Sequence, residues 1–135
     1  MCCRVLVVDD DPRFRALARD VLEHRGCVVV GEAGTGAAAR SATERLAPDA
    51  VLLDVRLPDE SGFEVCAALT ETGRAPAVLI VSAGDYGGCG VVALCGAKGF
   101  ALKSELVDID LARFWPMSGA PRAQPPTASA RLAAS

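Results

Sequence analysis

Five short apolar runs, separated by segments with helical periodicity, constrain the fold of this chain more than any other feature of its sequence. The runs are rich in β-branched residues and show no polar alternation, which is typical of strands buried on both faces. They span residues 5–8, 28–30, 50–53, 77–81 and 100–102. Strands that alternate with helices predict an α/β fold, with a parallel sheet covered by helices on both faces.

The intervening segments carry helix signals of unequal strength. Asp11 and Pro12 suit the N-cap and first turn of a helix that runs to about Arg25 and ends at Gly26. Residues 31–36 predict a loop. The other predicted helices span residues 37–46, 63–72 and 105–115. The segment 84–90 contains four glycines, each costing about 1 kcal/mol inside a helix, so helical character is expected only near residues 91–95.

Composition indicates one globular domain with a tail. The chain has 135 residues, of which 51% are hydrophobic, enough to bury a core without disulfides or metals. We expect the domain to span residues 1–115. Residues 116–135 contain four prolines among alanine and serine, a composition that predicts a disordered tail.

Cysteine spacing and charge exclude several classes of function. The six cysteines form no C-x-x-C pair and there is one histidine, so a zinc site is not expected. Most cysteines fall in apolar runs, which favours buried thiols and leaves a redox role as the alternative. No apolar run approaches the roughly 20 residues that span a bilayer, and the N-terminus lacks signal-peptide features. We therefore expect a cytoplasmic protein, and the net charge of −3 predicts no direct binding to nucleic acid or membranes.

Polar side chains follow four of the five predicted strands. Asp9 and Asp10 follow the first strand, Asp54 the third, Ser82 the fourth and Lys103 the fifth. The carboxyl ends of parallel strands meet at one edge of a sheet, where ligands of such folds bind. Carboxylates gathered there repel one another unless a cation neutralises them, and Mg²⁺ suits such oxygen ligands.

This set of groups matches the needs of phosphoryl transfer. A carboxylate can act as the nucleophile, a metal and a lysine can stabilise the phosphoryl charge, and a hydroxyl can contact a phosphoryl oxygen. Taken singly, each group has an ordinary explanation, such as a turn former or a solvated charge. Only their convergence on one sheet edge favours the chemical interpretation.

The sequence resembles the receiver domain of two-component response regulators, over about residues 4–115. The motifs that carry the resemblance are Val7–Pro12, Pro48–Asp54, Leu57–Pro58, Gly62, Val81–Ala83 and Gly99–Lys103. The resemblance implies a flavodoxin-like three-layer sandwich with strand order 2-1-3-4-5, of the stand-alone, chemotaxis-receiver-like kind.

The resemblance also implies roles for individual residues. Asp54 would be the phosphoacceptor, and Asp9 and Asp10 would hold Mg²⁺ with Asp54 and the backbone carbonyl of Arg56. Lys103 would pair with the phosphoryl group.

Two further residues would transmit the signal. The Ser82 hydroxyl would move toward the phosphoryl group. Phe100 would be the aromatic switch residue, although Phe100 also fits an ordinary core position. Their movement would bias a surface built from the fourth helix and the last strand and helix.

The resemblance further implies a function. The phosphoryl donor would be a histidine kinase or a small acyl phosphate, and the domain would act through contacts with an unknown downstream protein, as a monomer or a phosphorylation-dependent dimer. It would not be an enzyme beyond assisting its own phosphorylation and dephosphorylation.

Three features depart from the family pattern. Ser104 stands where many receivers have proline, so the following loop is expected to differ. The glycine-rich segment 84–90 predicts an unusual fourth helix. Arg56 and Gly84 occupy positions that tune dephosphorylation in the family, and Arg56 could either shield Asp54 from water or pair with the phosphoryl group.

Two other interpretations remain open at this stage. Residues 34–39 satisfy G-x-G-x-x-A, with Asp54 about 20 residues further on, which is the pattern of a dinucleotide-binding module. This pattern leaves Asp9, Asp10 and Lys103 without a role. The chain could also use a receiver fold as a protein-interaction module that is not phosphorylated.

Overall fold

A computed structural model describes residues 3–71, 75–84 and 95–117 of the chain. The strands are β1 (Arg4–Val8), β2 (Val28–Ala33), β3 (Ala50–Asp54), β4 (Ala77–Ser82) and β5 (Gly99–Leu102). The helices are α1 (Pro12–His24), α2 (Gly36–Leu46) and α3 (Gly62–Thr70), followed after β5 by two short 3₁₀ turns at Lys103–Glu105 and Leu111–Arg113.

The five strands form one parallel sheet with the order β2-β1-β3-β4-β5. All five residues of the central strand β3 are buried, as expected for a strand covered on both faces. The expected α/β sandwich with strand order 2-1-3-4-5 is therefore confirmed.

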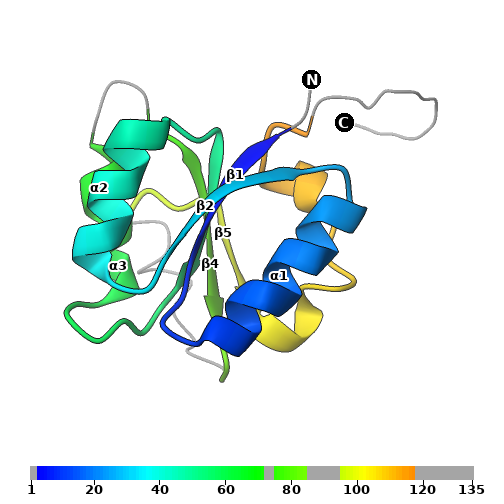
Figure 1. Ribbon diagram of the computed structural model, residues 1–135, viewed down its shortest axis with the longest axis horizontal. Helices are drawn as coiled ribbons and strands as arrows, with labels where there is room; N and C mark the ends of the chain where they lie inside the picture. The colour runs from blue at the N-terminus through cyan, green and yellow to red at the C-terminus, as the bar shows by residue number, and fades with distance from the viewer. Residues whose placement is uncertain (1–2, 72–74, 85–94, 118–135) are drawn as a thin grey trace.

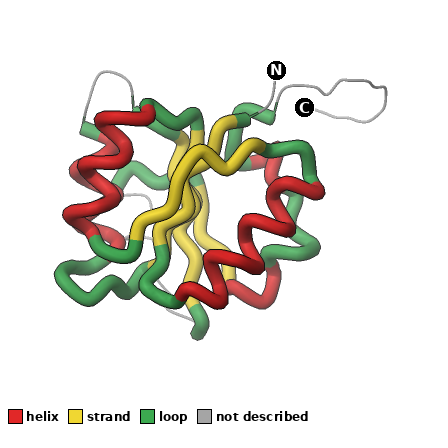
Figure 2. The backbone as a smooth tube through the Cα atoms, in the orientation of Figure 1, coloured by secondary structure: helices red, strands yellow, loops and turns green. Residues whose placement is uncertain are grey.

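Two hydrophobic cores lie on opposite faces of the sheet. Figures 1 and 2 show α1 and the segment after β5 on one face, and α2 and α3 on the other. Phe14, Leu22 and Trp115 belong to the first core, and Val65 and Leu69 to the second. Strands β1, β3, β4 and β5 contribute side chains alternately to the two cores.

The start of α1 forms as its sequence predicts. The Asp11 side chain accepts a hydrogen bond from Arg13 N at 2.9 Å, and Pro12 occupies the first turn. Gly26 follows the helix with φ +89°, a conformation that favours glycine. Asp11 is therefore the helix N-cap.

The second strand is longer than predicted, and the prediction of a loop over residues 31–36 is wrong for its first three residues. β2 continues to Ala33 because it stays paired with β1 as far as Val8, across a register shift between Val5 and Leu6. A Cβ atom on Gly31 would lie 2.7 Å from Leu46 Cδ1. Glycine here marks the close approach of α2 to the strand rather than a turn.

The predicted last helix over residues 105–115 is also wrong. The chain forms the two 3₁₀ turns instead, while Leu106, Leu111 and Trp115 are buried against α1 and the sheet. The Arg25 guanidinium donates hydrogen bonds to the carbonyls of Val107 and Ile109, at 3.4 and 2.5 Å. These carbonyls would be needed inside a continuous helix, so the tertiary contact competes with helix formation.

Other boundaries differ little from the predictions or lie beyond the described residues. The helix predicted over residues 63–72 is α3, which starts one residue earlier than predicted, at Gly62, and ends at Thr70. Residue 72 is not described. The predicted helix near residues 91–95 lies almost wholly outside the described residues, as does the tail from residue 118. Met117 packs against the first core. Within the described residues, no helix is long and apolar enough to cross a membrane.

Candidate functional site

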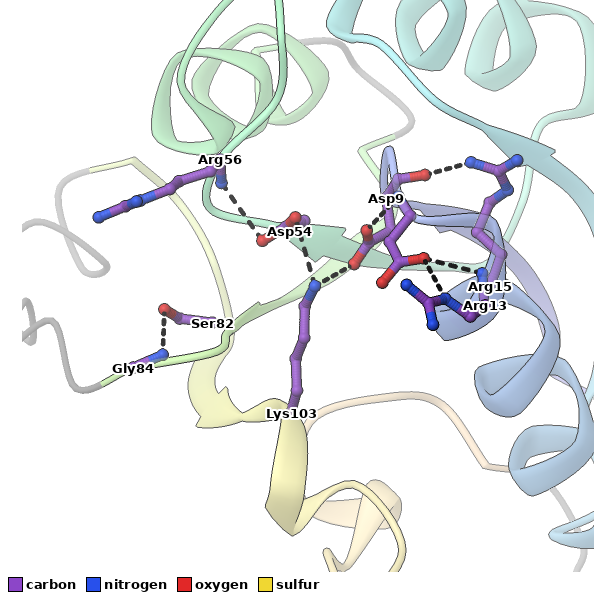
Figure 3. Close-up of polar contacts among 9 residues, drawn as sticks. Asp9, Arg13, Arg15, Asp54, Arg56, Ser82, Gly84 and Lys103 are labelled. Atoms are coloured by element: carbon purple, nitrogen blue, oxygen red, sulfur yellow. Dashed lines mark hydrogen bonds and ion pairs between the residues drawn. The ribbon is translucent and has the colours of Figure 1, made fainter.

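The polar groups predicted from the strand ends meet at the carboxyl edge of the sheet (Figure 3). A cavity of about 520 Å³ opens there, and its lining includes Asp10, Asp54, Ser82 and Lys103. Asp9 lies beside this cavity and is fully buried. The fold therefore brings together the five polar side chains that follow the predicted strands.

Lys103 lies between two of the carboxylates. Its Nζ is 2.6 Å from Asp9 Oδ2 and 3.5 Å from Asp54 Oδ2. The lysine side chain is 20% exposed, against 0% for Asp9 and 7% for Asp54. A single ammonium group thus neutralises part of a buried, doubly acidic site.

Asp54 and Lys103 each influence the pKa of the other. Burial and then the nearby Asp9 raise the pKa of Asp54, while the Arg56 N–H and Lys103 partly offset that rise. Burial alone would lower the pKa of Lys103, but its contacts with Asp9 and Asp54 outweigh burial and raise it. Lys103 is therefore held in its charged form.

Asp9 is fixed from several sides. Its Oδ1 accepts a hydrogen bond from Asp11 N at 2.8 Å, and its backbone carbonyl accepts one from Arg15 Nη1 at 2.5 Å. Arg15 is in turn held by Glu32, at 3.0 Å. The sequence alone did not indicate this role of Arg15, because its partners lie just after β1 and on β2.

Phe14 is a second residue that sequence reasoning missed. Phe14 lies in the helix predicted to run to about Arg25 and is buried, and its ring centroid also lies 4.4 Å from Lys103 Nζ. The aromatic face is therefore close enough for a cation–π contact with the ammonium group. Its helical spacing alone gave no signal for this contact.

The acidic cluster has the chemistry of a site for a hard divalent cation. Carboxylate oxygens of Asp9, Asp10 and Asp54 all lie within 4.8 Å of one another. Asp9 Oδ2 is buried and, among the described residues, receives no directed hydrogen bond beyond its ion pair with Lys103. Oxygen ligands with unused lone pairs suit Mg²⁺, so the residues present fit that ion.

Arg56 contributes its backbone rather than its side chain. Its N–H donates to Asp54 Oδ1 at 3.3 Å, while Figure 3 shows the exposed side chain directed away from Asp54 and Lys103.

Gly62, at the start of α3, lies against the backbone of Asp54 and Val55. A Cβ atom on Gly62 would overlap the Asp54 carbonyl oxygen and lie 2.8 Å from Val55 Cα. Only glycine allows α3 to begin this close to Asp54.

The two predicted switch residues lie in different places. Ser82 is 2% exposed, and its Oγ accepts a hydrogen bond from Gly84 N at 3.2 Å. Phe100 pairs in register with Ile80 and packs, half-buried, against the core shared with α2 and α3. Ser82 therefore faces the acidic cavity, and Phe100 does not line it.

Comparison with known proteins identifies the family. Residues 5–109 match the family model of the response regulator receiver domain. This chain therefore belongs to the receiver domain family of two-component response regulators, as its fold and acidic pocket indicate.

Relatives with known names show what the chain is similar to. The transcriptional regulatory protein NarL of Mycobacterium tuberculosis is 43% identical over 102 residues, which cover 74% of this chain and 47% of that protein. The nitrate/nitrite response regulator protein NarP of Escherichia coli is 38% identical over 103 residues, covering 74% and 47%. The chain thus spans about half the length of these curated relatives.

A solved structure supports the same fold. The signal receiver domain of the M. tuberculosis response regulator NarL superposes with a TM-score of 0.72 at 38% identity, covering 78% of this chain and 90% of that chain. The described residues therefore have the same fold as that receiver domain.

The dinucleotide-binding interpretation of residues 34–39 does not hold. Asp59 accepts hydrogen bonds from Gly36 N at 2.8 Å and Ala37 N at 3.1 Å. These are the N–H groups at the start of α2 that a pyrophosphate would need. A side chain of this protein already occupies that position, and the family assignment accounts for the acidic residues.

Proposed function

We propose that this domain accepts a phosphoryl group on Asp54, with Mg²⁺ held by neighbouring acidic side chains. The observation that supports this most directly is the position of Lys103 Nζ, 2.6 Å from Asp9 and 3.5 Å from Asp54. Lys103 and Asp54 both line the cavity, so a phosphoryl donor that enters the cavity would reach Asp54 while Lys103 stays paired.

The reaction follows from this geometry. An Asp54 carboxylate oxygen attacks the phosphorus atom of the donor and forms a P–O bond. The P–N bond of a phosphohistidine, or the P–O bond of an acyl phosphate, breaks with its electron pair on the leaving group. Burial and Asp9 raise the pKa of Asp54, and the Arg56 N–H and Lys103 offset part of this rise, in the direction of the charged, nucleophilic form.

Mg²⁺, when bound, supplies positive charge against the phosphoryl oxygens. Asp9, Asp10, Asp54 and the backbone carbonyl of Arg56 are the groups that we propose as its ligands. Lys103 would neutralise the remaining charge, since phosphorylation turns a carboxylate of charge −1 into a group of about −2.

We propose that Ser82 and Phe100 report the new charge. The Ser82 hydroxyl, which now accepts from Gly84 N, would turn to donate to a phosphoryl oxygen. Its movement would open space beside β5, into which the half-buried Phe100 ring would rotate. The signal would then leave through protein contacts.

The donor and the output belong to the same proposal. A histidine kinase or a small acyl phosphate would supply the phosphoryl group in the cytoplasm. Some relatives are described as transcriptional regulators and others as protein-glutamate methylesterases, so the family serves several outputs. For this domain we propose a downstream protein partner rather than direct nucleic-acid binding or catalysis on a separate substrate.

Phosphate-affinity electrophoresis tests the proposal. We expect the wild-type chain to give a shifted band with acetyl phosphate and Mg²⁺, and to lose it when the Mg²⁺ is chelated. Asp54→Asn should abolish the band because the nucleophile is gone. Asp20→Asn, a matched change at an exposed position of α1, should leave the band unchanged.

The test has a clear opposite outcome. A wild-type chain that gives no shifted band with acetyl phosphate or with a histidine kinase would contradict phosphorylation of Asp54. That result would instead favour the receiver fold acting as an unphosphorylated interaction module.

A further inference from the structure

The four cysteines within the described residues form two buried pairs. Cys3 lies near Cys27, and Cys66 near Cys95, and none of these four residues forms a disulfide in the described structure. The proposed phosphorylation of Asp54 uses neither pair. The pairs differ in their surroundings, and the difference indicates which one is reactive.

Cys3 and Cys27 lie side by side at the edge of the sheet. They immediately precede β1 and β2, whose paired positions begin at Arg4 and Val28. Val28 N donates to the Cys3 carbonyl at 2.9 Å, and both thiols belong to the same core. Neighbouring strands lie about 4.8 Å apart, within the roughly 4.4–6.8 Å between Cα atoms that a disulfide spans.

The pair is close to the protein surface although each residue is buried. β2 is the outer strand of the sheet, and Val28, next to Cys27, is 45% exposed. The Cys27 thiol also contacts the Met117 thioether, with 3.7 Å between the sulfur atoms. Met117 is only partly buried, so displacing one flexible side chain gives a reagent access.

The two thiols have unequal reactivity. A hydrogen bond from Cys3 lowers the pKa of Cys27 despite burial, and Arg25 lowers it further. The same interaction with Cys27, followed by burial, raises the pKa of Cys3. Cys27 is therefore the more readily formed thiolate, and the thiolate is the attacking species in disulfide exchange.

We propose that Cys3 and Cys27 are a redox-active dithiol that forms an intramolecular disulfide by exchange with a low-molecular-weight disulfide. The Cys27 thiolate attacks one sulfur of that disulfide, forms a mixed disulfide and releases one thiol. Cys3 then loses its proton and attacks the Cys27 sulfur, which releases the second thiol. The protein loses two electrons and two protons, and the small disulfide takes them up.

The second step becomes easier once the first has occurred. Interaction with the Cys27 thiolate is the main reason that Cys3 holds its proton. Capping Cys27 removes that negative charge, so Cys3 ionises more readily next to its target.

The other pair serves as an internal control. Cys66 is fully buried in the middle of α3, and its thiol donates to the Cys95 carbonyl at 3.3 Å. Burial is the main cause that raises the pKa of Cys66, and no described cation offsets it. A thiol of this kind reacts slowly.

Mass-spectrometric mapping after incubation of the folded chain with oxidised glutathione at neutral pH tests the proposal. We expect a peptide pair linked through Cys3 and Cys27, with Cys66 still reduced. Cys3→Ser should accumulate a glutathione adduct on Cys27, because the resolving thiol is absent. Cys27→Ser should form neither the adduct nor the link. In the wild-type chain, Cys27 should react with an alkylating reagent about tenfold faster than Cys66.

Two control variants complete the design. Cys66→Ser should form the Cys3–Cys27 link as the wild type does, and so should Cys2→Ser, which removes the neighbouring thiol. Absence of the link in folded wild-type protein, absence of the Cys27 adduct in Cys3→Ser, or loss of the link in Cys2→Ser would each overturn the proposal.

This inference does not depend on phosphorylation. Strand β1 separates Cys3 from Asp9 by about 20 Å, at about 3.3 Å per residue. We therefore expect the oxidised chain to accept phosphate on Asp54 as the reduced chain does, and failure of either assay leaves the other unaffected.

Discussion

At the scale of single residues, Lys103 joins the parts of the acidic site. It lies within 4 Å of two buried carboxylates and against the ring of Phe14. A carboxylate that is buried without a partner is costly, and removing one member of a buried pair leaves the other uncompensated. The stability of the domain should therefore depend on this one ammonium group whenever no metal is bound.

Replacing Lys103 with methionine tests this dependence. In the presence of a chelator, we expect Lys103→Met to lower the free energy of unfolding by about 2 kcal/mol, the size of a contact with a charged group, because Asp9 loses its cation. Added Mg²⁺ should stabilise the variant more than the wild type, because in the variant Mg²⁺ does not compete with an ammonium group for Asp9. Urea unfolding with and without Mg²⁺ measures both effects.

Lys98 provides a matched control for this change. It is exposed and precedes β5, so Lys98→Met should change the unfolding free energy by no more than about 0.5 kcal/mol. If Lys103→Met were as stable as Lys98→Met in chelator, the proposed pairing of Lys103 with Asp9 would not contribute to the fold.

At the scale of elements, the loop between β3 and α3 is attached to α2. Asp59 accepts from two N–H groups at the start of α2, and Glu60 forms an ion pair with Arg40 on the same helix. Ser61 and Glu64 form a capping box that begins α3. The loop that follows Asp54 is thus held by both neighbouring helices, which fixes the backbone of the site.

Replacing Asp59 with alanine should loosen this attachment. Hydrogen bonds from Gly36 N and then Ala37 N lower the pKa of Asp59, so its contribution is complete above the ordinary carboxyl pKa. That contribution disappears as the pH falls through the lower folded-state pKa. We expect Asp59→Ala to lower the Tm at neutral pH, and the difference from the wild type to shrink in acid.

Thermal unfolding across a pH series measures this effect. Asp20→Ala, at an exposed position of α1, should leave the Tm close to the wild-type value at every pH. A Tm difference for Asp59→Ala that stays constant from neutral to strongly acidic solution would contradict the role of the carboxylate.

At the scale of the whole molecule, the segment after β5 closes the core above α1. It contains only two 3₁₀ turns, yet it buries Leu106, Leu111 and Trp115. Arg25, at the end of α1, holds the carbonyls of Val107 and Ile109. Contacts between distant parts of the chain therefore replace the hydrogen bonds of a regular helix.

Replacing Arg25 with methionine should release this segment while keeping an unbranched side chain. We expect the free energy of unfolding to fall by about 2 kcal/mol, the size of hydrogen bonds that involve a charged group. Hydrogen exchange should accelerate most at residues 106–117, because they lose their attachment to α1. Arg13→Met, at a side chain that is 96% exposed, is the control.

The control distinguishes the effect of losing the Arg25 hydrogen bonds from the effect of replacing any arginine with methionine. Equal hydrogen exchange in Arg25→Met and Arg13→Met would show that Arg25 does not hold the segment. Faster exchange confined to residues 106–117 in Arg25→Met would support the contact.

Local sequence was sufficient to predict most of the framework. The apolar runs and the helical spacing depend on neighbouring residues, so five strands, three helices and the Asp11 cap follow from them. Because parallel strands align their carboxyl ends, the same pattern also predicts that Asp9, Asp54, Ser82 and Lys103 share one edge. Their meeting needed no knowledge of individual contacts.

Only the tertiary structure decided the features that depend on distant partners. Gly31 stays in a strand because β1 pairs with it and Leu46 packs against it. Residues 105–115 form 3₁₀ turns rather than one helix, and the Arg25 guanidinium donates to the carbonyls of Val107 and Ile109 in that segment. Local propensity differs between conformations by less than about 1 kcal/mol per residue, and a few long-range contacts outweigh it. The Phe14 ring beside Lys103 depends in the same way on packing between α1 and the end of β5, which no local pattern records.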